Sequence, residues 1–443
     1  MKILKSIYLN NRLFLAIGIV VFAFVISFVV GGYIFLPKTL FYVLLSIIAT
    51  DLILLFRFRK GIDGARETPD KLSNGDENLL TIHVENFYPF KIHIRVIDEI
   101  PHQFQRRDVS FLRAVEAGGE STIEYQLRPV KRGEYSFGAV NIFAQSPIGF
   151  FSRRFRFSAN KIVPVYPSYL QMRKYELLAI SNRLTETGIK KIRRIGHNME
   201  FELIKEYVSG DDYRTINWKA TARKSQLMVN HFQDERSQQV YNLIDKGRVM
   251  QMPFDGLSLL DYAINASLVI SNIAIRKSDK AGLLTFQDKI GTYVAPGRAS
   301  NQMSRILETL YNQKTAYRET DFGAVYNFVR RKITQRSLLL LYTNFESIYS
   351  LERQLPFLKK LAHQHLLVVI FFENTEMKAL IEQPADDLRQ IYHKAIAERF
   401  AYERKLIVRE LKNHGIQAVL TAPKDLTVNT INKYLELKAR GLI

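Results

Sequence analysis

The chain has 443 residues, of which 47% are hydrophobic and 24% charged, so it can bury two or three cores and is not globally disordered. It contains no Cys, which excludes disulfides, thiol catalysis and Cys-ligated zinc. Its formal net charge of +20 favours an anionic partner, such as anionic lipid, an acidic protein surface or nucleic acid.

Two apolar segments near the N-terminus, residues 13–30 and 39–56, predict a transmembrane hairpin. The first segment has 18 residues and no charge. As a helix it is about 27 Å long, which is close to one hydrocarbon thickness. A cleaved signal peptide is the alternative, but no small-residue cleavage site follows and the second segment comes at once.

The flanks of this hairpin predict its orientation. Cations gather outside the two segments, whereas the turn between them holds only Lys38. The flanking cations are Lys2, Lys5, Arg12, Arg57, Arg59, Lys60 and Arg66. The positive-inside bias therefore predicts a two-span protein of the bacterial inner membrane, with its soluble domains in the cytoplasm. Asp51, inside the second segment, is either part of a polar relay or helix contact, or a side chain near the interface that meets Arg57 or Arg59.

Four segments with different patterns follow the hairpin, which occupies residues 1–60. Residues 61–78 are polar and rich in turn formers, and predict a linker. Residues 79–167 alternate apolar and polar side chains between Gly-rich turns, which predicts an antiparallel β-sandwich-like domain. Residues 168–237 are charged and lack a clear period. Residues 238–443 alternate apolar runs with amphipathic helices, which predicts a doubly wound α/β domain.

The segment from Gly196 to Arg223, GHNMEFELIKEYVSGDDYRTINWKATAR, has a dense pattern of charged, aromatic and turn residues. We expect Glu200 and Phe201 to open a helical turn, and Gly210 to adopt a positive φ. Asp211 is expected to cap the next turn. The remaining expectations are a local lock of Asp212 with Arg214, a buried anchor at Trp218, and a bidentate bond from Arg223 to an acid.

This segment resembles the signature of the bacterial domain of unknown function 58 (DUF58) family. The matching positions are Glu200, Phe201, Lys205, Glu206, Tyr207, Gly210, Asp211, Asp212, Arg214, Ile216, Trp218, Lys219, Ala222 and Arg223. The stretch from Lys131 to Ser152 and the paired N-terminal spans also resemble that family. The resemblance implies a membrane partner of a MoxR-type AAA+ ATPase, with a von Willebrand factor type A-like C-terminal domain and no established enzymatic activity.

A type A domain holds a divalent ion with Asp-x-Ser-x-Ser, a Thr and a later Asp. Here the first loop begins at Asp245, but Gly247 and Val249 replace both Ser residues. Thr320 matches the Thr, and Asn344 stands at the later Asp position. This degenerate set has too few oxygens for a hard cation, so we expect no metal or other cofactor. Lys246 or Arg248 is expected to neutralise Asp245.

Three functions fit the sequence. The first is a non-enzymatic, membrane-anchored scaffold or adaptor that contacts a MoxR-type ATPase or its client in cell-envelope or complex-assembly processes. The second is a hydrolase that uses Glu206, Asp211 and Asp212 with His231. The third is a protein that binds anionic lipid or nucleic acid through a basic run. That run consists of Lys190, Lys191, Arg193 and Arg194. The adaptor accounts for most features, and membrane anchoring disfavours nucleic acid as the partner.

Overall fold

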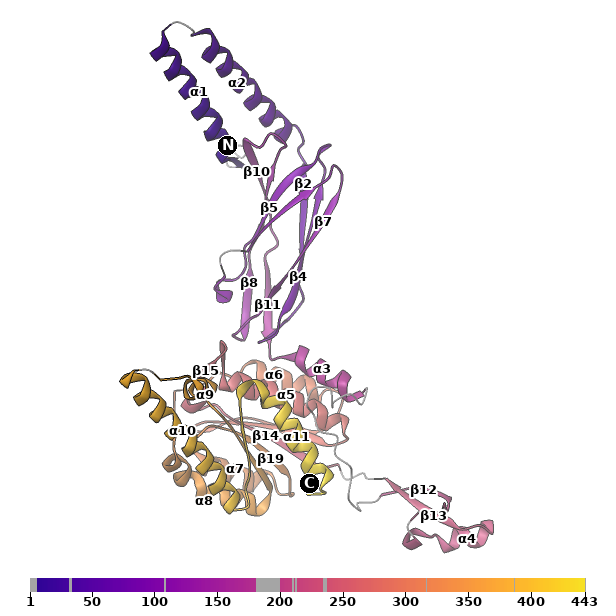
Figure 1. Ribbon diagram of the computed structural model, residues 1–443. Coiled ribbons are helices and arrows are strands. Elements are labelled where there is room, and N and C mark those ends of the chain that lie inside the picture. Colours follow the sequence, from indigo (N-terminus) through magenta and orange to yellow (C-terminus); the bar gives the residue numbers. More distant parts are fainter. Residues whose placement is uncertain are drawn as a thin grey trace. The chain divides into compact units, whose positions relative to one another are not determined.

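The structure is a computed structural model that describes residues 6–31, 34–106, 109–180, 200–208, 211, 213–233, 237–315, 317–385 and 387–442 (Figure 1). The chain divides into two compact units, Met1–Tyr166 and Pro167–Ile443. The first unit holds two apolar helices and an antiparallel β domain. The second holds an α/β domain and a small arm of two strands and a short helix.

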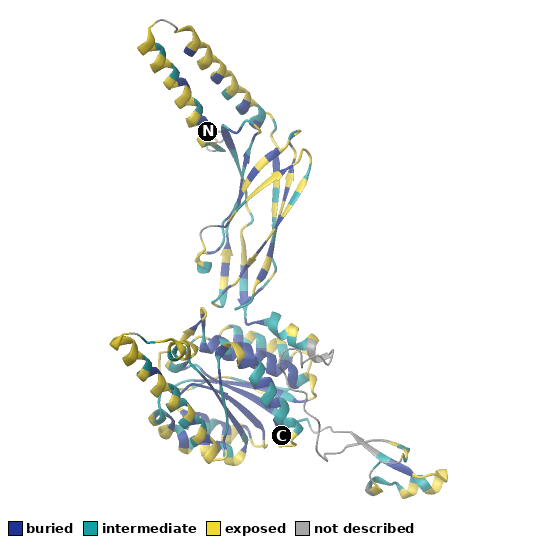
Figure 2. Cartoon of the chain, viewed as in Figure 1, coloured by how far each residue is buried: buried dark blue, intermediate teal, exposed yellow. Residues whose placement is uncertain are grey.

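The two helices of the first unit are α1 (Asn11–Val30) and α2 (Phe35–Phe56), and we call them the hairpin. Both are long and apolar enough to cross a membrane by length and composition. Most of their side chains are exposed (Figure 2). Water is a poor environment for so much contiguous apolar surface, so this surface requires an apolar cover.

The β domain consists of three antiparallel or mixed sheets around one core. A five-stranded sheet has the order β1 (Ile7–Leu9), β10 (Phe151–Phe157), β9 (Val140–Gln145), β5 (Ile92–Asp98), β6 (Ser110–Val115). A three-stranded sheet has the order β2 (Ile62–Glu67), β4 (Asn78–Asn86), β7 (Glu120–Leu127). A smaller sheet consists of β3 (Leu72–Ser73), β11 (Lys161–Tyr166) and β8 (Gly133–Phe137). Alternate residues of β4, including Leu80, Ile82 and Val84, are buried, as the period of two predicts.

The predicted linker, residues 61–78, is instead part of the β domain. It contributes β2, β3 and the first residue of β4, and β2 pairs with β4 along its whole length. Strand β2 was not predicted because this segment has a polar composition. Arg66, which the sequence suggested as a membrane-flanking cation, is buried in an ion pair with Asp98. A cation can occupy a buried position in place of an apolar residue when an acid is paired with it.

Asp51 does not meet Arg57 or Arg59, as the simpler interpretation of the sequence expected. Its side chain is fully buried, and its carboxylate accepts hydrogen bonds from the backbone N–H groups of Phe150 (2.9 Å) and Phe151 (3.0 Å). The hairpin is therefore bonded directly to the β domain.

The α/β domain contains a six-stranded sheet in which all neighbours are parallel except one edge strand. The order is β18 (Ile290–Gly297), β17 (Lys280–Phe286), β14 (Gln239–Asp245), β19 (Leu338–Tyr342), β20 (Leu366–Phe372), β21 (Gln417–Thr421), and β18 is the antiparallel strand. Helices α5 (Leu259–Arg276), α6 (Gln302–Tyr311) and α11 (Leu426–Ala439) pack on one face. Helices α7 (Phe322–Lys332), α8 (Ile348–Gln364) and α10 (Leu388–Asn413) pack on the other.

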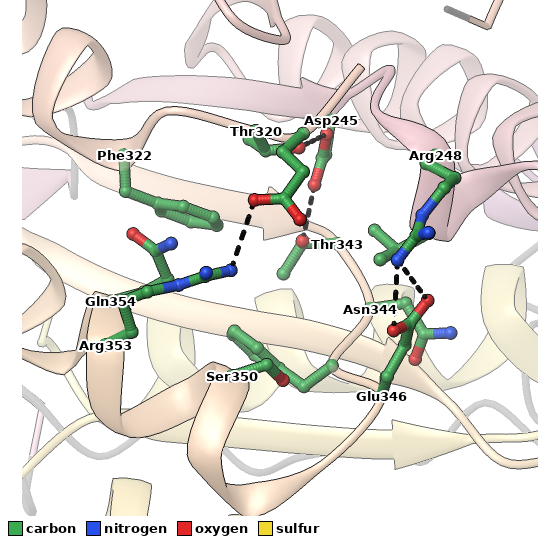
Figure 3. A pocket seen from close by; sticks show the side chains of 13 residues that line it. Asp245, Arg248, Thr320, Phe322, Thr343, Asn344, Glu346, Ser350, Arg353 and Gln354 are labelled. Atoms are coloured by element: carbon green, nitrogen blue, oxygen red, sulfur yellow. Dashed lines mark hydrogen bonds and ion pairs between the residues drawn. The ribbon is translucent and has the colours of Figure 1, made fainter. Parts of the chain in front are cut away.

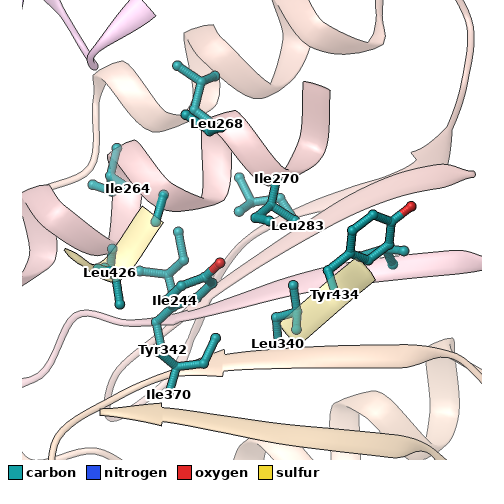
Figure 4. Close-up of a cluster of buried hydrophobic side chains, with 14 of the residues drawn as sticks. Ile244, Ile264, Leu268, Ile270, Leu283, Leu340, Tyr342, Ile370, Leu426 and Tyr434 are labelled. Atoms are coloured by element: carbon teal, nitrogen blue, oxygen red, sulfur yellow. The ribbon is translucent and has the colours of Figure 1, made fainter. Parts of the chain in front are cut away.

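Neighbouring residues of the central strand β14 supply both cores of this domain. Ile244 belongs to one buried cluster with Ile264 and Ile270 of α5 (Figure 4), whereas Leu243 belongs to the opposite cluster. Such strands read as continuous apolar runs because each face of the sheet is covered. Helix α5 begins at a capping box in which Ser258 and Asp261 each bond the other's backbone.

The remaining elements of the second unit lie at its N-terminal end and between α8 and α10. Helix α3 (Tyr169–Ile180) packs on α5 through Met172 and Tyr175, and α9 (Thr375–Glu382) precedes α10. Strands β12 (Glu200–Glu206) and β13 (Met228–Gln233) pair antiparallel, with the short helix α4 (Trp218–Lys224) between them. We call residues 200–233 the signature arm, of which residues 200–208, 211 and 213–233 are described.

Candidate functional site

Asp245 lies at the carboxyl end of β14, at the edge of the sheet where open α/β domains bind ligands. Its carboxylate is fully buried and accepts three hydrogen bonds, two of which, from threonine hydroxyls, are drawn in Figure 3. The hydroxyls of Thr320 and Thr343 donate to its two oxygens, each at 2.7 Å, and the backbone N–H of Gly247 donates at 2.8 Å. Thr320 precedes α7 and Thr343 follows β19, so three separate segments converge on one carboxylate.

Among the described residues, no cation forms an ion pair with Asp245, contrary to the expectation for Lys246 and Arg248. Arg248 forms an ion pair with Glu346 at 3.4 Å, and the Lys246 ammonium lies beside Gly291. Burial raises the pKa of Asp245 above its usual value, although the three hydrogen bonds oppose that rise. Burial likewise lowers the pKa of the half-buried Lys246.

Asn344 lines the same pocket as Asp245 and Thr320, but its amide oxygen accepts a hydrogen bond from Arg404 at 2.8 Å. The pocket encloses about 500 Å³, open mouth included. Two ion pairs flank it, Arg248 with Glu346 at 3.4 Å and Arg353 with Glu319 at 3.5 Å (Figure 3). The degenerate metal-site residues thus line one pocket, and only Asp245 and Thr320 bond each other.

The space around Gly247 leaves no room for the Ser that a type A pattern has at this position. A Cβ added to Gly247 would lie 2.2 Å from the Thr320 hydroxyl oxygen and 3.0 Å from a carboxylate oxygen of Asp245. A Ser at this position and the bond from Thr320 to Asp245 therefore exclude each other. The sequence did not reveal Thr343, although a polar residue directly after an apolar strand was the available signal.

The residues around Asp245 do not fit a divalent cation. Both carboxylate oxygens are already bonded, and the two hydroxyls that could serve as ligands donate to that carboxylate. Hard cations need six or more oxygen ligands. Across the residues that the structure describes, no group of three or more His, Asp or Glu gathers in a metal-binding arrangement.

We expect Mg²⁺ or Mn²⁺ to leave the melting temperature of the full-length protein unchanged, because a ligand that binds only the native state must raise its stability. Thermal melting in detergent, with and without each ion, measures this. Asp245→Ala is the control variant. A metal-dependent shift in the wild-type protein that disappears in Asp245→Ala would contradict the expectation.

The signature arm departs from the sequence-based interpretation at several positions. Glu200 and Phe201 begin strand β12 and not a helical turn. Asp211 does not cap a helix: it accepts hydrogen bonds from the Lys205 ammonium at 3.0 Å and from the Val208 N–H at 3.1 Å, which closes the turn after β12. The cap of α4 is Asn217, whose side chain accepts from Ala220 N–H at 3.0 Å.

Trp218 is not a buried anchor, because 70% of its surface is exposed. It stands at the start of α4, directly before exposed Lys219 and five residues before exposed Arg223. Only Met228 and Val229 of the arm's described side chains are buried. Four further large apolar side chains of the arm are exposed, namely Ile204, Val208, Tyr213 and Leu227. A two-stranded hairpin of this size is marginally stable alone, and its exposed apolar surface fits a contact with another surface.

Several predicted residues lie outside the described part of the chain. These are Gly210, Asp212 and the basic run Lys190, Lys191, Arg193 and Arg194, together with the side chains of Arg214 and His231. Of the proposed catalytic carboxylates, Glu206 is exposed, and Asp211 is occupied by Lys205 and the Val208 N–H. Tyr207 is half-buried, and its N–H donates to the Leu227 carbonyl at 2.8 Å.

The family model described as "Protein of unknown function DUF58" matches residues 204–391, which include most of the signature arm and the pocket around Asp245. The uncharacterized protein YeaD of Bacillus subtilis (strain 168) is 26% identical over 225 residues. Both findings support a relationship between this chain and the DUF58 family. The match with YeaD covers 49% of this chain and 55% of YeaD, so the chain matches about half the length of that relative.

Two solved structures each match 46% of the chain. The conserved hypothetical protein BatB from Bacteroides thetaiotaomicron is 13% identical, with a TM-score of 0.28, over 46% of this chain and 99% of BatB. Proximal thread matrix protein 1 from the mussel byssus is 10% identical, with a TM-score of 0.27, over 46% of this chain and 48% of its own. Both TM-scores are too low to establish a shared fold.

Proposed function

We propose that this protein is a membrane-anchored adaptor that contacts a cytoplasmic partner through the signature arm. The exposure of Trp218 carries this proposal. Trp and Arg dominate the binding energy of protein interfaces, and Trp218, Lys219 and Arg223 of α4 are all exposed. This surface fits a partner with an apolar pocket and an acidic rim.

The hairpin is the proposed anchor. Its two helices have the length and composition of membrane spans, and their exposed apolar side chains favour lipid as their cover. Exposed Arg57, Arg59 and Lys60 follow α2, which favours a bacterial inner membrane with the soluble domains in the cytoplasm.

The α/β domain is proposed to be von Willebrand factor type A-like and to act without a metal ion. Its central strand ends at Asp245, and loops from two other parts of the chain bring Thr320 and Thr343 to that carboxylate. The match with the DUF58 family model supports a MoxR-type AAA+ ATPase as the proposed partner, because the resemblance to that family implies such a partner. Adaptor function needs no catalytic group at this pocket.

We expect Trp218→Ala to weaken partner capture about tenfold or more while leaving the unfolding free energy within about 0.5 kcal/mol of wild type. Tagged full-length protein, purified from native membranes in mild detergent, is probed for a co-purifying AAA+ ATPase. Tyr392→Ala is the matched control, because it removes an equally exposed aromatic side chain from α10 (66% exposed). Unchanged capture, or an equal loss in both variants, would contradict the proposal.

A further inference from the structure

The hairpin and the β domain meet at a buried carboxylate. Asp51 of α2 accepts two backbone N–H groups, from Phe150 and Phe151, and the hydroxyl of Ser146. All three donors belong to the loop between β9 and β10 and its end at the start of β10. Charge-assisted hydrogen bonds are stronger than neutral ones, and buried bonds of this kind hold a loop in one position. The loop is therefore fixed against α2.

A second group of bonds ties the end of α2 to the same domain. The guanidinium of Arg153 donates to the carbonyl oxygens of Leu55 and Phe58, each at 2.7 Å. The Tyr88 hydroxyl donates to the Leu55 carbonyl at 2.8 Å. The last carbonyl groups of a helix have no hydrogen-bond donors within the helix, and here side chains of the β domain supply some of those donors. We call these contacts, with Asp51, the joint.

Apolar side chains are exposed beside the joint. Phe87 directly precedes the buried Tyr88, its N–H donates to the Gly61 carbonyl at 3.0 Å, and 50% of its side chain is exposed. Leu9 lies two residues before the start of α1 and is 54% exposed. The joint thus sets these two side chains next to the ends of both apolar helices.

Exposed cations follow the end of α2, close to the joint. Arg57, Arg59 and Lys60 follow α2 directly and are exposed. Within the part of the chain that the structure describes, none of the three forms an ion pair with an acid. Lys91 on the β domain, by contrast, pairs with Glu116 at 2.6 Å. Cations without acidic partners, next to an apolar span, complement the phosphates of anionic lipids.

We propose that Leu9, Phe87, Arg57, Arg59 and Lys60 form a collar that binds anionic phospholipid headgroups, with the two apolar side chains in the interfacial layer. The collar rests on the proposed membrane anchor and adds to it a preference for a lipid class. Lys and Arg suit this layer because their apolar stems can lie in it while their charged ends stay in water, and apolar side chains such as Leu9 and Phe87 can enter the boundary between headgroups and acyl chains. The joint holds the β domain at the membrane surface, so that the domain does not swing on a loose tether.

The charge of the collar is tested with the full-length protein in detergent, to which phosphatidylglycerol or phosphatidylcholine is added. We expect phosphatidylglycerol to raise the melting temperature more than phosphatidylcholine does. The triple variant Arg57→Gln/Arg59→Gln/Lys60→Gln should lose this difference, with an apparent affinity for phosphatidylglycerol at least about tenfold weaker. The matched control, Arg330→Gln/Arg331→Gln/Lys332→Gln, removes the same charge from exposed positions at the end of α7 and should keep it. A difference that is absent in wild type, or that survives in the collar variant, overturns the proposal.

The depth of the collar is tested by fluorescence in vesicles of phosphatidylglycerol that contain brominated lipid. Trp218 is the only Trp, so Phe87→Trp in a Trp218→Phe background reports on one position. Its emission should be quenched more strongly than that of Ile162→Trp in the same background, which replaces an equally apolar residue of β11 that is 64% exposed. Equal quenching at the two positions overturns the interfacial placement.

Carbonate extraction of the same vesicles separates failure of the collar from failure of the anchor. Release of the chain overturns both the anchor and the collar. Retention together with a preference for phosphatidylglycerol supports both, and retention without that preference overturns the collar alone.

Discussion

Arg66→Ala is expected to lower the unfolding free energy of the full-length protein by about 3–5 kcal/mol, because it leaves a buried carboxylate without its cation. The side chains of Arg66 and Asp98 are fully buried and form an ion pair. Arg66 also donates to the carbonyls of Gly138 (3.1 Å) and Ala159 (2.6 Å), and Asp98 accepts from the Tyr125 hydroxyl. Burial raises the pKa of Asp98 even with the guanidinium present, so an unpaired Asp98 would be costly.

Denaturant unfolding, followed by a β-domain signal, measures this loss. Arg95→Ala is the control, because Arg95 is exposed on β5 of the same domain and its loss should change stability by no more than about 0.5 kcal/mol. The double variant Arg66→Ala/Asp98→Ala should lose less than the sum of the single variants, since both ends of one pair are then gone. An Arg66→Ala variant as mild as Arg95→Ala would show that the pair contributes little.

Asp51→Ala is expected to lower the unfolding free energy by a similar amount, about 3–5 kcal/mol, because two buried donors and one part-buried donor lose their acceptor. Those donors are the N–H groups of Phe150 and Phe151 and the hydroxyl of Ser146. The variant should also loosen the joint between the hairpin and the β domain. Asp63→Ala, which removes an exposed carboxylate from β2, should change neither property.

The loosening is measured by the distance between two spin labels. The chain has no Cys, so labels can be placed on Cys introduced at Val43 of α2 and Leu112 of β6, both exposed. We expect a narrow distance distribution in the wild-type background and in Asp63→Ala, and a broad one in Asp51→Ala. A distribution that stays narrow in Asp51→Ala would mean that Arg153 and Tyr88 hold the joint without the carboxylate.

The sequence predicted those parts of the fold that depend on the burial of periodic apolar residues. The two apolar helices, the alternating strands and the parallel strands with both faces covered all follow from composition and period. The contact of Asp51 could not be predicted, because its acceptor role depends on a loop about 100 residues later in the chain. The strand β2 was missed for a related reason. Arg66 can be buried because it pairs with Asp98. Asp98 lies on β5, in another sheet, so this pairing could not be inferred from the local sequence.

The candidate site was predicted in outline from positions along the chain. Asp245 and Asn344 at strand ends could be inferred from the order of apolar runs, whereas Thr320 was expected only from the resemblance to a type A domain. The role of Gly247 as the space for the Thr320 hydroxyl could not, since that depends on an approach of 2.2 Å in three dimensions. The exposure of Trp218 was also missed, because a lone Trp in a dense motif fits a buried anchor and a contact residue equally well.

The proposed adaptor function depends on a contact made by α4, and photocrosslinking in living cells tests this contact most directly. A photoreactive amino acid replaces Trp218 in the full-length protein, and the same substitution at Tyr392 of α10 provides the comparison. The adaptor proposal predicts a covalent adduct with an AAA+ ATPase at position 218 and a much weaker one at position 392. An adduct at position 218 that joins only to this chain itself, or to lipid, would contradict the proposal.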